Sequence, residues 1–203
     1  MLKTIFFDLG NVLVFFSHEK MFDQLAVCTN LTVQTIKQML FEERLQQDYE
    51  TGRIDSLSIY ERFQKRSPKL FSFNQFITAA SDIFTPNTSL WPLVEQLKRI
   101  GIRLILLSNT SECHFNSVYA KYPVLQLFDD QVLSFQLGFM KPDSRIFLKA
   151  LSRAKCAPEE CFYIDDIPEF IDAAKKVGLD AELFLGVVPL KKALAARGII
   201  DLA

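Results

Sequence analysis

The sequence predicts an α/β protein with a doubly wound, mostly parallel sheet and an inserted all-helical domain. From residue 87 onward, short apolar runs alternate with amphipathic helical patterns, which is typical of a parallel sheet covered by helices on both faces. Residues 15–85 show helical periodicity instead. We therefore expect a core domain built from residues 1–14 and 86–203 and a helical domain built from residues 15–85.

The first expected strand covers residues 4–7 and ends at Asp8, where a turn follows. In the inserted segment, apolar residues at three- and four-residue spacing predict helices at 20–29, 33–49, 56–65 and 73–84. The later helices are expected at 89–100, 112–121, 144–154, 168–177 and 190–196. The later strands are expected at 102–107, 131–135 and 161–164, with a further apolar stretch at 181–185.

Composition excludes several classes of function. The 203 residues include 23 Lys and Arg against 24 Asp and Glu, a net charge of -1, so we expect no nucleic-acid partner. No apolar run reaches the roughly 18 residues of a membrane span, and Asp8 comes too early for a secretory signal. We expect a cytoplasmic protein. Four Cys without metal-ligand spacing and two His also argue against a zinc-type site.

Polar residues follow several expected strands, at the sheet edge where ligands of such folds bind. Asp8 follows the first strand, Ser108 and Asn109 follow another, and Asp165 precedes Asp166 at the end of a third. The segment 138–143, which contains a Lys-Pro-Asp sequence, comes after the strand near residue 132. Each signal alone is also typical of a turn or a helix cap. Their combination predicts one polar site at this edge.

In these segments the chain resembles the haloacid dehalogenase superfamily. Residues 7–13, 106–109, 138–143 and 163–166 are similar to its four motifs, in the same order. The helical insertion falls where the family places its C1 cap. The opening Asp-Leu-Gly-Asn-Val looks most like the branch that holds bacterial glucose-1-phosphate phosphatase and the amino-terminal phosphatase domain of epoxide hydrolases.

The resemblance implies a hydrolase, a phosphatase that acts on a small phosphorylated metabolite, with a sugar phosphate favoured. Asp8 would attack phosphorus and form an aspartyl-phosphate, since a carboxylate needs no base to activate it. Ser108 and Asn109 would bind the phosphoryl oxygens. Lys141 would neutralise the negative charge of the transition state.

The resemblance also implies a Mg²⁺ cofactor, which prefers hard oxygen ligands. Asp8, the carbonyl of Gly10 and Asp166 are the expected metal ligands, and Asp165 would orient Lys141. Adjacent carboxylates repel each other unless a positive charge lies nearby, so a metal ion and Lys141 explain the acid pair.

The chain departs from the family at Gly10, where phosphatases usually carry a second Asp that protonates the leaving group. Losing a positioned proton donor typically costs ~10²–10⁴ in rate. His18 is one candidate replacement because the pKa of imidazole lies near neutrality, and a surface or helix-capping role is the other interpretation of this residue.

Two other functions stay open. An L-2-haloacid dehalogenase also uses the first Asp as nucleophile, needs no metal and lacks the second Asp, although it typically has an aromatic residue at the position of Gly10. A binding or regulatory protein could hold a phosphorylated ligand without turnover. Metal dependence separates the first from a phosphatase, and tight binding without turnover identifies the second. The substrate and the oligomeric state are open.

Overall fold

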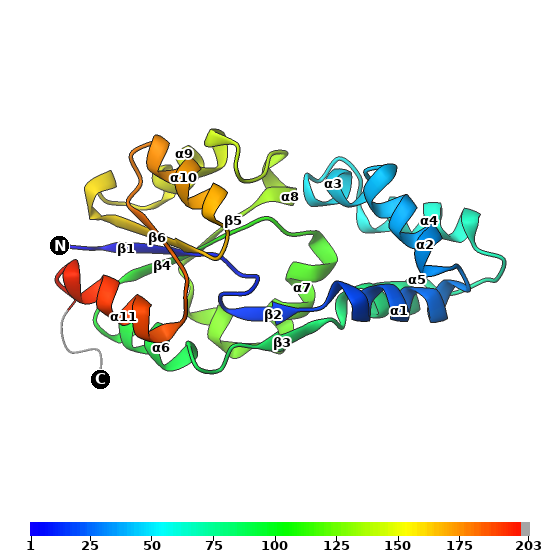
Figure 1. Cartoon of the computed structure of the whole chain (residues 1–203), viewed down its shortest axis with the longest axis horizontal. Helices are drawn as coiled ribbons and strands as arrows, with labels where there is room; N and C mark the ends of the chain where they lie inside the picture. Colours follow the sequence, from blue (N-terminus) through cyan, green and yellow to red (C-terminus); the bar gives the residue numbers. More distant parts are fainter. Residues whose placement is uncertain (200–203) are drawn as a thin grey trace.

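The computed structural model describes residues 1–199, and a five-stranded sheet forms the centre of the larger lobe (Figure 1). In spatial order the strands are β5 (Asp130–Leu133), β4 (Arg103–Ser108), β1 (Thr4–Phe7), β6 (Cys161–Asp165) and β7 (Ala181–Leu183). Every neighbouring pair is parallel. The predicted α/β class with a mostly parallel sheet is therefore confirmed.

Alternating side chains of the strands supply two separate cores, because successive residues of a strand point to opposite faces of the sheet. Ile5 and Phe7 belong to one buried cluster and Phe6 to the other. The Phe6 face is covered by α9 (Ser144–Arg153) and α10 (Pro168–Lys176). The opposite face is covered by α6 (Trp91–Arg99), α7 (Glu112–Lys121) and α11 (Val187–Ala196), as Figure 1 shows. This is the doubly wound arrangement.

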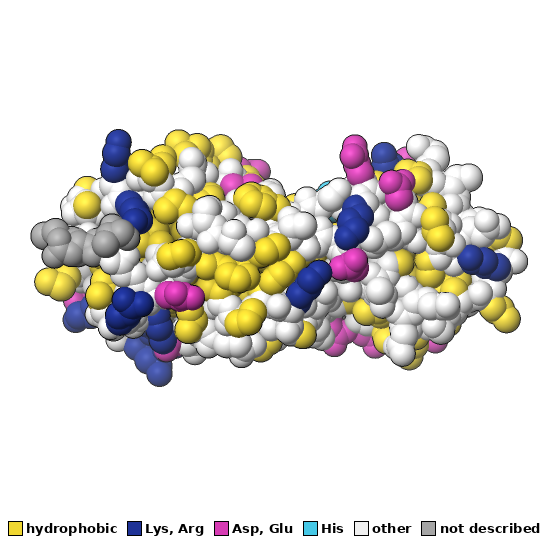
Figure 2. Space-filling view, turned by 90° about the horizontal axis from the view of Figure 1, so that it is seen from below, with side chains coloured by type: hydrophobic (Ala, Val, Ile, Leu, Met, Phe, Trp, Pro, Cys, Tyr) yellow, Lys and Arg dark blue, Asp and Glu magenta, His cyan; other side chains and the backbone are white. Residues whose placement is uncertain are grey.

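A helical segment leaves and re-enters the core through an antiparallel ribbon of β2 (Val14–Phe16) and β3 (Phe84–Pro86). Its helices are α1 (His18–Thr29), α2 (Val33–Lys37), α3 (Leu45–Glu50), α4 (Ser56–Arg66) and α5 (Phe73–Ser81). They form the second lobe of an elongated molecule (Figures 1 and 2). We call this segment the cap, and we propose the bounds 15–85 for it.

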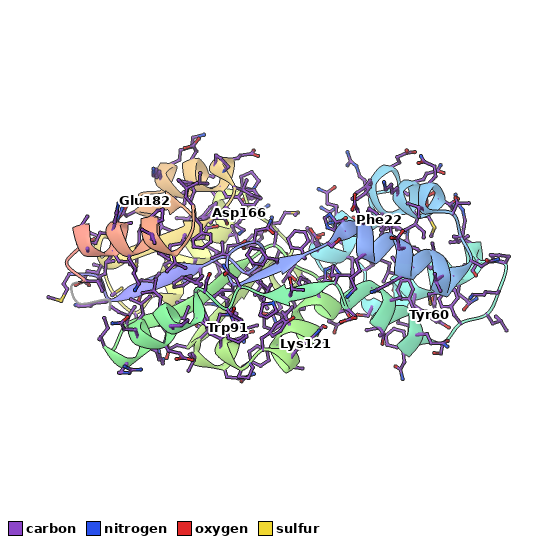
Figure 3. The ribbon with its side chains drawn as sticks, turned by 60° about the horizontal axis from the view of Figure 1, so that its bottom comes forward. Phe22, Tyr60, Trp91, Lys121, Asp166 and Glu182 are labelled. Carbon is purple, nitrogen blue, oxygen red and sulfur yellow. The ribbon has the colours of Figure 1, made fainter. Side chains whose placement is uncertain are left out.

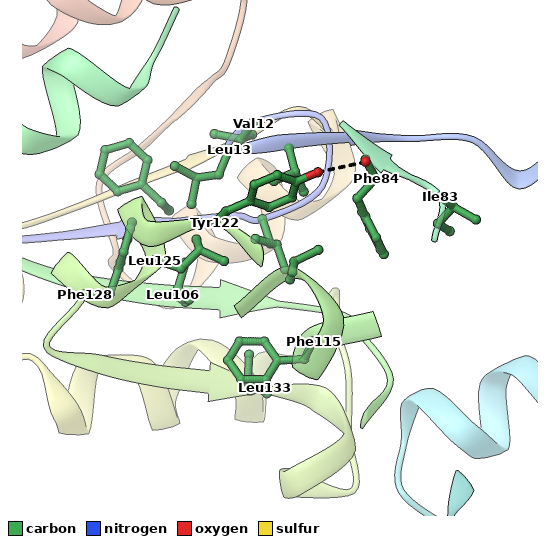
Figure 4. Close-up of a cluster of buried hydrophobic side chains, with 14 of the residues drawn as sticks. Val12, Leu13, Ile83, Phe84, Leu106, Phe115, Tyr122, Leu125, Phe128 and Leu133 are labelled. Carbon is green, nitrogen blue, oxygen red and sulfur yellow. Dashed lines mark hydrogen bonds between the residues drawn. The ribbon is translucent and has the colours of Figure 1, made fainter. Parts of the chain in front are cut away.

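Side-chain hydrogen bonds fix the ribbon, and the residues just before it, to the core. The Tyr122 hydroxyl donates to the Phe84 carbonyl at 2.8 Å inside a buried apolar cluster (Figure 4). The Asn87 side chain donates to the Val12 carbonyl at 2.7 Å, and the Trp91 indole donates to Leu13 at 3.4 Å. Buried polar groups that are paired in this way hold a segment in one position. Both connections to the cap therefore start from a rigid base.

The predicted helix at 33–49 is wrong. α2 ends at Lys37, a π-helical turn covers Gln38–Glu42, and Arg44 has a φ of 59° before α3 begins. Met39, Leu40 and Leu45 are all buried, and a five-residue step from Leu40 to Leu45 does not keep one face of a continuous 3.6-residue helix. The π turn and the break restore the shared face.

Other boundaries also differ from prediction, and two of the differences bear on how the cap and the sheet end. The helix expected at 73–84 ends at Ser81 because residues 84–86 pair with β2. The strand expected at 131–135 ends at Leu133, and the short helix α8 (Ser134–Leu137) follows. Both differences come from partners that are distant in sequence. Among the described residues, none of the helices has the length and apolar character that crossing a bilayer requires.

Candidate active site

Asp8 stands where three strand ends meet. In the sheet register Phe7 lies between Leu106 of β4 and Ile164 of β6. The residue after Phe7 therefore lies beside the carboxyl ends of both neighbours, and the Asp8 amide donates to the Ile164 carbonyl at 3.0 Å. Such an edge is where open α/β sheets bind ligands. The rigid strand gives the Asp8 carboxylate one fixed position.

Lys141 is almost completely enclosed, with 2% of its surface exposed. Its Nζ lies 2.7 Å from Asp8 Oδ1 and 2.6 Å from Asp165 Oδ2. It also contacts the Leu107 carbonyl and the Tyr163 hydroxyl, both at 3.1 Å. The Tyr163 hydroxyl donates in turn to Asp165. A buried cation with this many partners is held in a single orientation.

Asn109 supports the main chain of Lys141. Its Nδ2 donates to the Lys141 carbonyl at 2.9 Å, and its Oδ1 accepts from the Lys141 amide at 2.8 Å. The Asn109 side chain is thus engaged by the protein, and its predicted phosphate-binding role is left to its main-chain amide. Ser108 is buried beside it, with its hydroxyl 3.3 Å from the Asn109 carbonyl.

The carboxylates of Asp8, Asp165 and Asp166 gather at one point, with ligand oxygens within 4.8 Å of one another. Asp165 is fully buried, and besides Lys141 it accepts from the Ile167 amide at 2.9 Å. Asp166 is partly exposed and accepts from the Asn11 side chain at 3.1 Å. In Figure 3 it lies at the edge of the core that faces the cap. The predicted site residues therefore come together.

Electrostatics at this edge favour a further cation. Burial raises the pKa of Asp8 to about 7; Lys141 opposes this rise and Asp165 adds to it. Burial lowers the pKa of Lys141, but Asp8 and Asp165 outweigh it and hold this pKa above its usual value. Burial also raises the pKa of Asp166. Three acids around one ammonium leave excess negative charge, and their oxygen atoms are the ligands that Mg²⁺ prefers.

The structure shows what occupies the place of a side chain at Gly10. A Cβ atom built on Gly10 would lie 2.9 Å from Cε1 of the Phe16 ring, closer than side chains pack. The aromatic ring of the ribbon thus fills the space that the family's second Asp would enter. The chain therefore differs from the family's usual pattern at Gly10 itself and also in the Phe16 ring that packs beside it.

A small pocket of about 70 Å³ adjoins this edge. It is lined by residues of the core, the ribbon and the cap: Leu9, Gly10, Phe16, His18, Glu50, Ile83, Phe84, Ser108, Asn109, Thr110 and His114. Sequence reasoning missed Glu50 and His114. Glu50 precedes the turn at Gly52, which the sequence pattern marks only as a helix boundary, and His114 lies in the first turn of α7. Ser17, not His18, caps α1.

Comparison with known proteins decides the family. The sequence model of the haloacid dehalogenase-like hydrolases matches residues 2–178. The chain belongs to this family. This confirms the predicted superfamily, and relatives with phosphatase activity make the chain a hydrolase related to phosphatases. The finer branch suggested by the Asp-Leu-Gly-Asn-Val opening stays a prediction.

Individual relatives of this hydrolase are distant. It is similar to a sesquiterpene phosphatase of Aspergillus oryzae, with 23% identity over 182 residues that cover 87% of each chain. It is also 25% identical to the drimenol cyclase of Aspergillus calidoustus over 91% of its own length, but spans only 34% of that cyclase. A HAD family enzyme of Bacteroides thetaiotaomicron, solved with magnesium and inorganic phosphate, superposes with a TM-score of 0.75 at 24% identity, covering 90% of this chain and 94% of that one.

Proposed function

We propose that this hydrolase is a Mg²⁺-dependent phosphatase that cleaves a small phosphate monoester through an aspartyl-phosphate on Asp8. The observation that carries the proposal is Lys141, whose Nζ is held between Asp8 and Asp165 at the carboxyl edge of the sheet. Phosphoryl transfer needs a placed nucleophile and positive charge around the phosphoryl oxygens, with little other chemistry. This edge supplies both.

In the first step an Asp8 carboxylate oxygen attacks phosphorus, and the bond from phosphorus to the ester oxygen breaks. Lys141, already 2.7 Å from Asp8, offsets the charge that develops on the phosphoryl group. Ser108 and the Asn109 amide lie on the pocket wall, where they would donate to phosphoryl oxygens. Water then attacks the aspartyl-phosphate, which releases phosphate and restores Asp8.

The proposal that Mg²⁺ binds here rests on the oxygen atoms available as ligands. Asp8, the Gly10 carbonyl and Asp166 would hold Mg²⁺, and Asp165, engaged by Lys141 and the Ile167 amide, would orient Lys141. The bound ion would offset the repulsion between the Asp8 carboxylate and an anionic substrate. The magnesium and phosphate bound by the related Bacteroides enzyme support this choice of ion.

Relatives support the substrate class. Two relatives are named as phosphatases. One is the sesquiterpene phosphatase, and the other is a glyceraldehyde 3-phosphate phosphatase of Methanothermobacter thermautotrophicus, which is 33% identical to this chain over 99 residues. A sugar phosphate as substrate, a cytoplasmic location and the lack of a nucleic-acid or membrane partner stay predictions. The apolar walls at Phe16, Ile83 and Phe84 favour adding phosphates with apolar alcohols to any test panel.

The test is phosphate release from sugar phosphates, isoprenoid phosphates, nucleotides and an aryl phosphate, with Mg²⁺ or with chelator. We expect metal-dependent release that Asp8→Asn abolishes and Asp172→Asn, an exposed change of the same kind on α10, does not. Mg²⁺ should also raise the thermal unfolding midpoint of the wild type, because an ion that binds only the folded state stabilises it. Asp166→Asn should weaken that shift.

Two outcomes would point elsewhere. Halide release from an L-2-haloacid without added metal would assign the dehalogenase reaction, although that reaction gives no reason for the acid pair at Asp165 and Asp166. Saturable binding of a phosphorylated compound to folded wild type, without any release of phosphate, would assign the non-catalytic function.

A further inference from the structure

The proposed phosphatase reaction needs a proton for the ester oxygen that leaves. Gly10 has no side chain, and Phe16 fills the space beside it. The donor must therefore come from another wall of the pocket that adjoins Asp8. Among its lining residues, the ones that titrate at ordinary pH are His18, Glu50 and His114.

His114 is unsuited to this task. Its Nε2 lies 3.1 Å from the Ala80 carbonyl, which accepts hydrogen bonds only, so the ring proton is committed to that bond. Burial lowers the pKa of His114 to about 4. The ring is thus neutral at pH 7, and its proton points into the contact between α7 and α5.

His18 is also held in its neutral form. It is the first residue of α1, where the positive end of the helix dipole disfavours an imidazolium. Its ring packs against Phe16 at a centroid distance of 5.0 Å, and burial lowers its pKa. A neutral imidazole in an aromatic wall is a weak proton donor.

Glu50 has the opposite surroundings. It is the last residue of α3, where the negative end of the helix dipole favours a protonated carboxyl, and burial raises its pKa. Gln46, one helical turn earlier, donates from Nε2 to Glu50 Oε1 at 2.8 Å. Gln46 Oε1 is buried and has no hydrogen-bond partner among the described residues.

The unpaired Gln46 oxygen gives the pair a second arrangement. Amide nitrogen and oxygen exchange places when the side chain turns by half a rotation, and Gln46 Oε1 can then accept a hydrogen bond from the hydroxyl of a neutral Glu50 carboxyl. Gln46 can thus donate to the Glu50 carboxylate and accept from the Glu50 acid. A partner that suits both protonation states is what a group that gains and loses a proton in each cycle requires.

Contacts between cap and core hold Glu50 over the pocket. Its neighbour Tyr49 accepts from the Cys113 amide of α7 at 3.0 Å. Two residues later, Gly52 has a φ of 67°, and a Cβ there would lie 2.0 Å from the Phe135 carbonyl, so its backbone lies directly against α8. Glu50 is therefore placed by core atoms on both sides.

We propose that Glu50 is the proton donor and acceptor of this hydrolase, in place of the missing acid at Gly10. As Asp8 attacks phosphorus, the neutral Glu50 carboxyl gives its proton to the departing ester oxygen, which leaves as an alcohol. The resulting carboxylate takes a proton from the water that attacks the aspartyl-phosphate, so phosphate is released and Glu50 is neutral again. The acid thus comes from the cap.

The test compares Glu50→Gln with Glu61→Gln, an exposed change on α4 of the same cap. The two probes are p-nitrophenyl phosphate, whose phenolate leaves without a proton, and phenyl phosphate, whose leaving group needs one. With Glu50→Gln we expect a burst of about one nitrophenolate per enzyme, then slow turnover while phosphorylated enzyme accumulates. Phenyl phosphate should show no burst and a turnover at least ~10²-fold slower than wild type.

Glu61→Gln should match wild type with both probes. Equal slowing of the two probes by Glu50→Gln without a burst, or wild-type rates with both, overturns the assignment of Glu50. If Glu50→Gln does not fold, Glu50→Ala assayed with and without added formate replaces it, and restored phenyl phosphate turnover supports the inference while no restoration overturns it. Absence of Asp8-dependent release from wild type would instead reject the proposed phosphatase itself.

Discussion

The two walls of the candidate site are built in different ways. The core wall, with Asp8, Lys141 and Asp165, follows strand ends of one sheet and is closed by short hydrogen bonds and ion pairs. The cap wall, with Glu50 and Gly52, comes from a short helix after a π turn and depends on contacts to α7 and α8.

The two walls therefore suit different tasks: the core wall holds reacting groups in fixed positions, and the cap wall meets the substrate. The core wall cannot move without breaking the sheet, so it suits the nucleophile and the cation of the proposed reaction. The cap wall lies outside the sheet and connects to the core through the two-stranded ribbon and its contacts to α7 and α8, so it suits groups that must meet a substrate after it enters. Loss of a buried charge in the core wall should therefore cost stability and activity together, whereas a change confined to the Glu50 side chain should affect mainly activity.

The largest effect is expected for Lys141→Met at pH 8 in chelator. It leaves Asp8 and Asp165 buried without their cation, which should lower the free energy of unfolding by about 3–5 kcal/mol. Phosphate release with Mg²⁺ should fall by more than ~10²-fold. Urea unfolding and the release assay measure both, with exposed Lys149→Met on α9 as control. A loss of stability equal to that of the control would contradict the view that Lys141 stabilises the buried carboxylates of the core wall.

Acid should weaken the contact between α7 and the cap. The pKa of His114 is lowered by burial to about 4, below the value of about 6.5 in an unfolded chain. Stability from the neutral ring is thus fully present above pH 6.5 and is lost as pH falls toward 4, by up to about 3 kcal/mol. His114→Gln does not titrate, so urea unfolding at pH 7 and 4.5 should show a smaller loss than wild type. If wild type and His114→Gln lose the same free energy of unfolding between pH 7 and 4.5, protonation of His114 does not contribute to the acid sensitivity.

Gly52→Ala tests how closely the cap must approach α8. Both Gly52 and Gly101 have positive φ, but a Cβ at Gly101 meets nothing within 4 Å, so Gly101→Ala carries the backbone strain alone, of about 1 kcal/mol. Gly52→Ala should cost at least about 1 kcal/mol more and should raise KM, because the added methyl keeps the cap away from Phe135. Thermal unfolding and steady-state kinetics compare the two variants. Equal behaviour would mean that the contact is unimportant.

The smallest effect is expected for Tyr163→Phe. This change removes the hydroxyl that contacts Lys141 and Asp165, while the ring stays packed against Phe147. Because both charged partners keep each other, the loss should be about 1 kcal/mol, and phosphate release should fall only a few-fold. Urea unfolding measures the first quantity and the release assay the second. A loss as large as that of Lys141→Met would mean that Tyr163 also fixes the ion pair.

Sequence patterns predicted the core wall well because each part of it is local. A short apolar run marks a buried strand, and a polar residue directly after the strand must lie at its tip, so the pattern alone places Asp8, Ser108 and Asp165 at the carboxyl edge of the sheet. Lys141 was predicted from the motif in which it stands. The hydrogen-bond partners of the site residues were not predicted. Tyr163 and Asn11 are such partners, and nothing in their spacing along the sequence marks them.

The sequence by itself determined the parallel sheet, the helical insertion and the residues at the strand ends, because those features depend on periodicity within short windows. Only the tertiary structure decided that β3 follows α5, that the helix at 33–49 breaks, that Phe16 fills the space beside Gly10, and that Glu50 meets the pocket. Each of these depends on atoms far apart in the chain, whose packing fixes a residue's surroundings after local propensity has fixed its secondary structure.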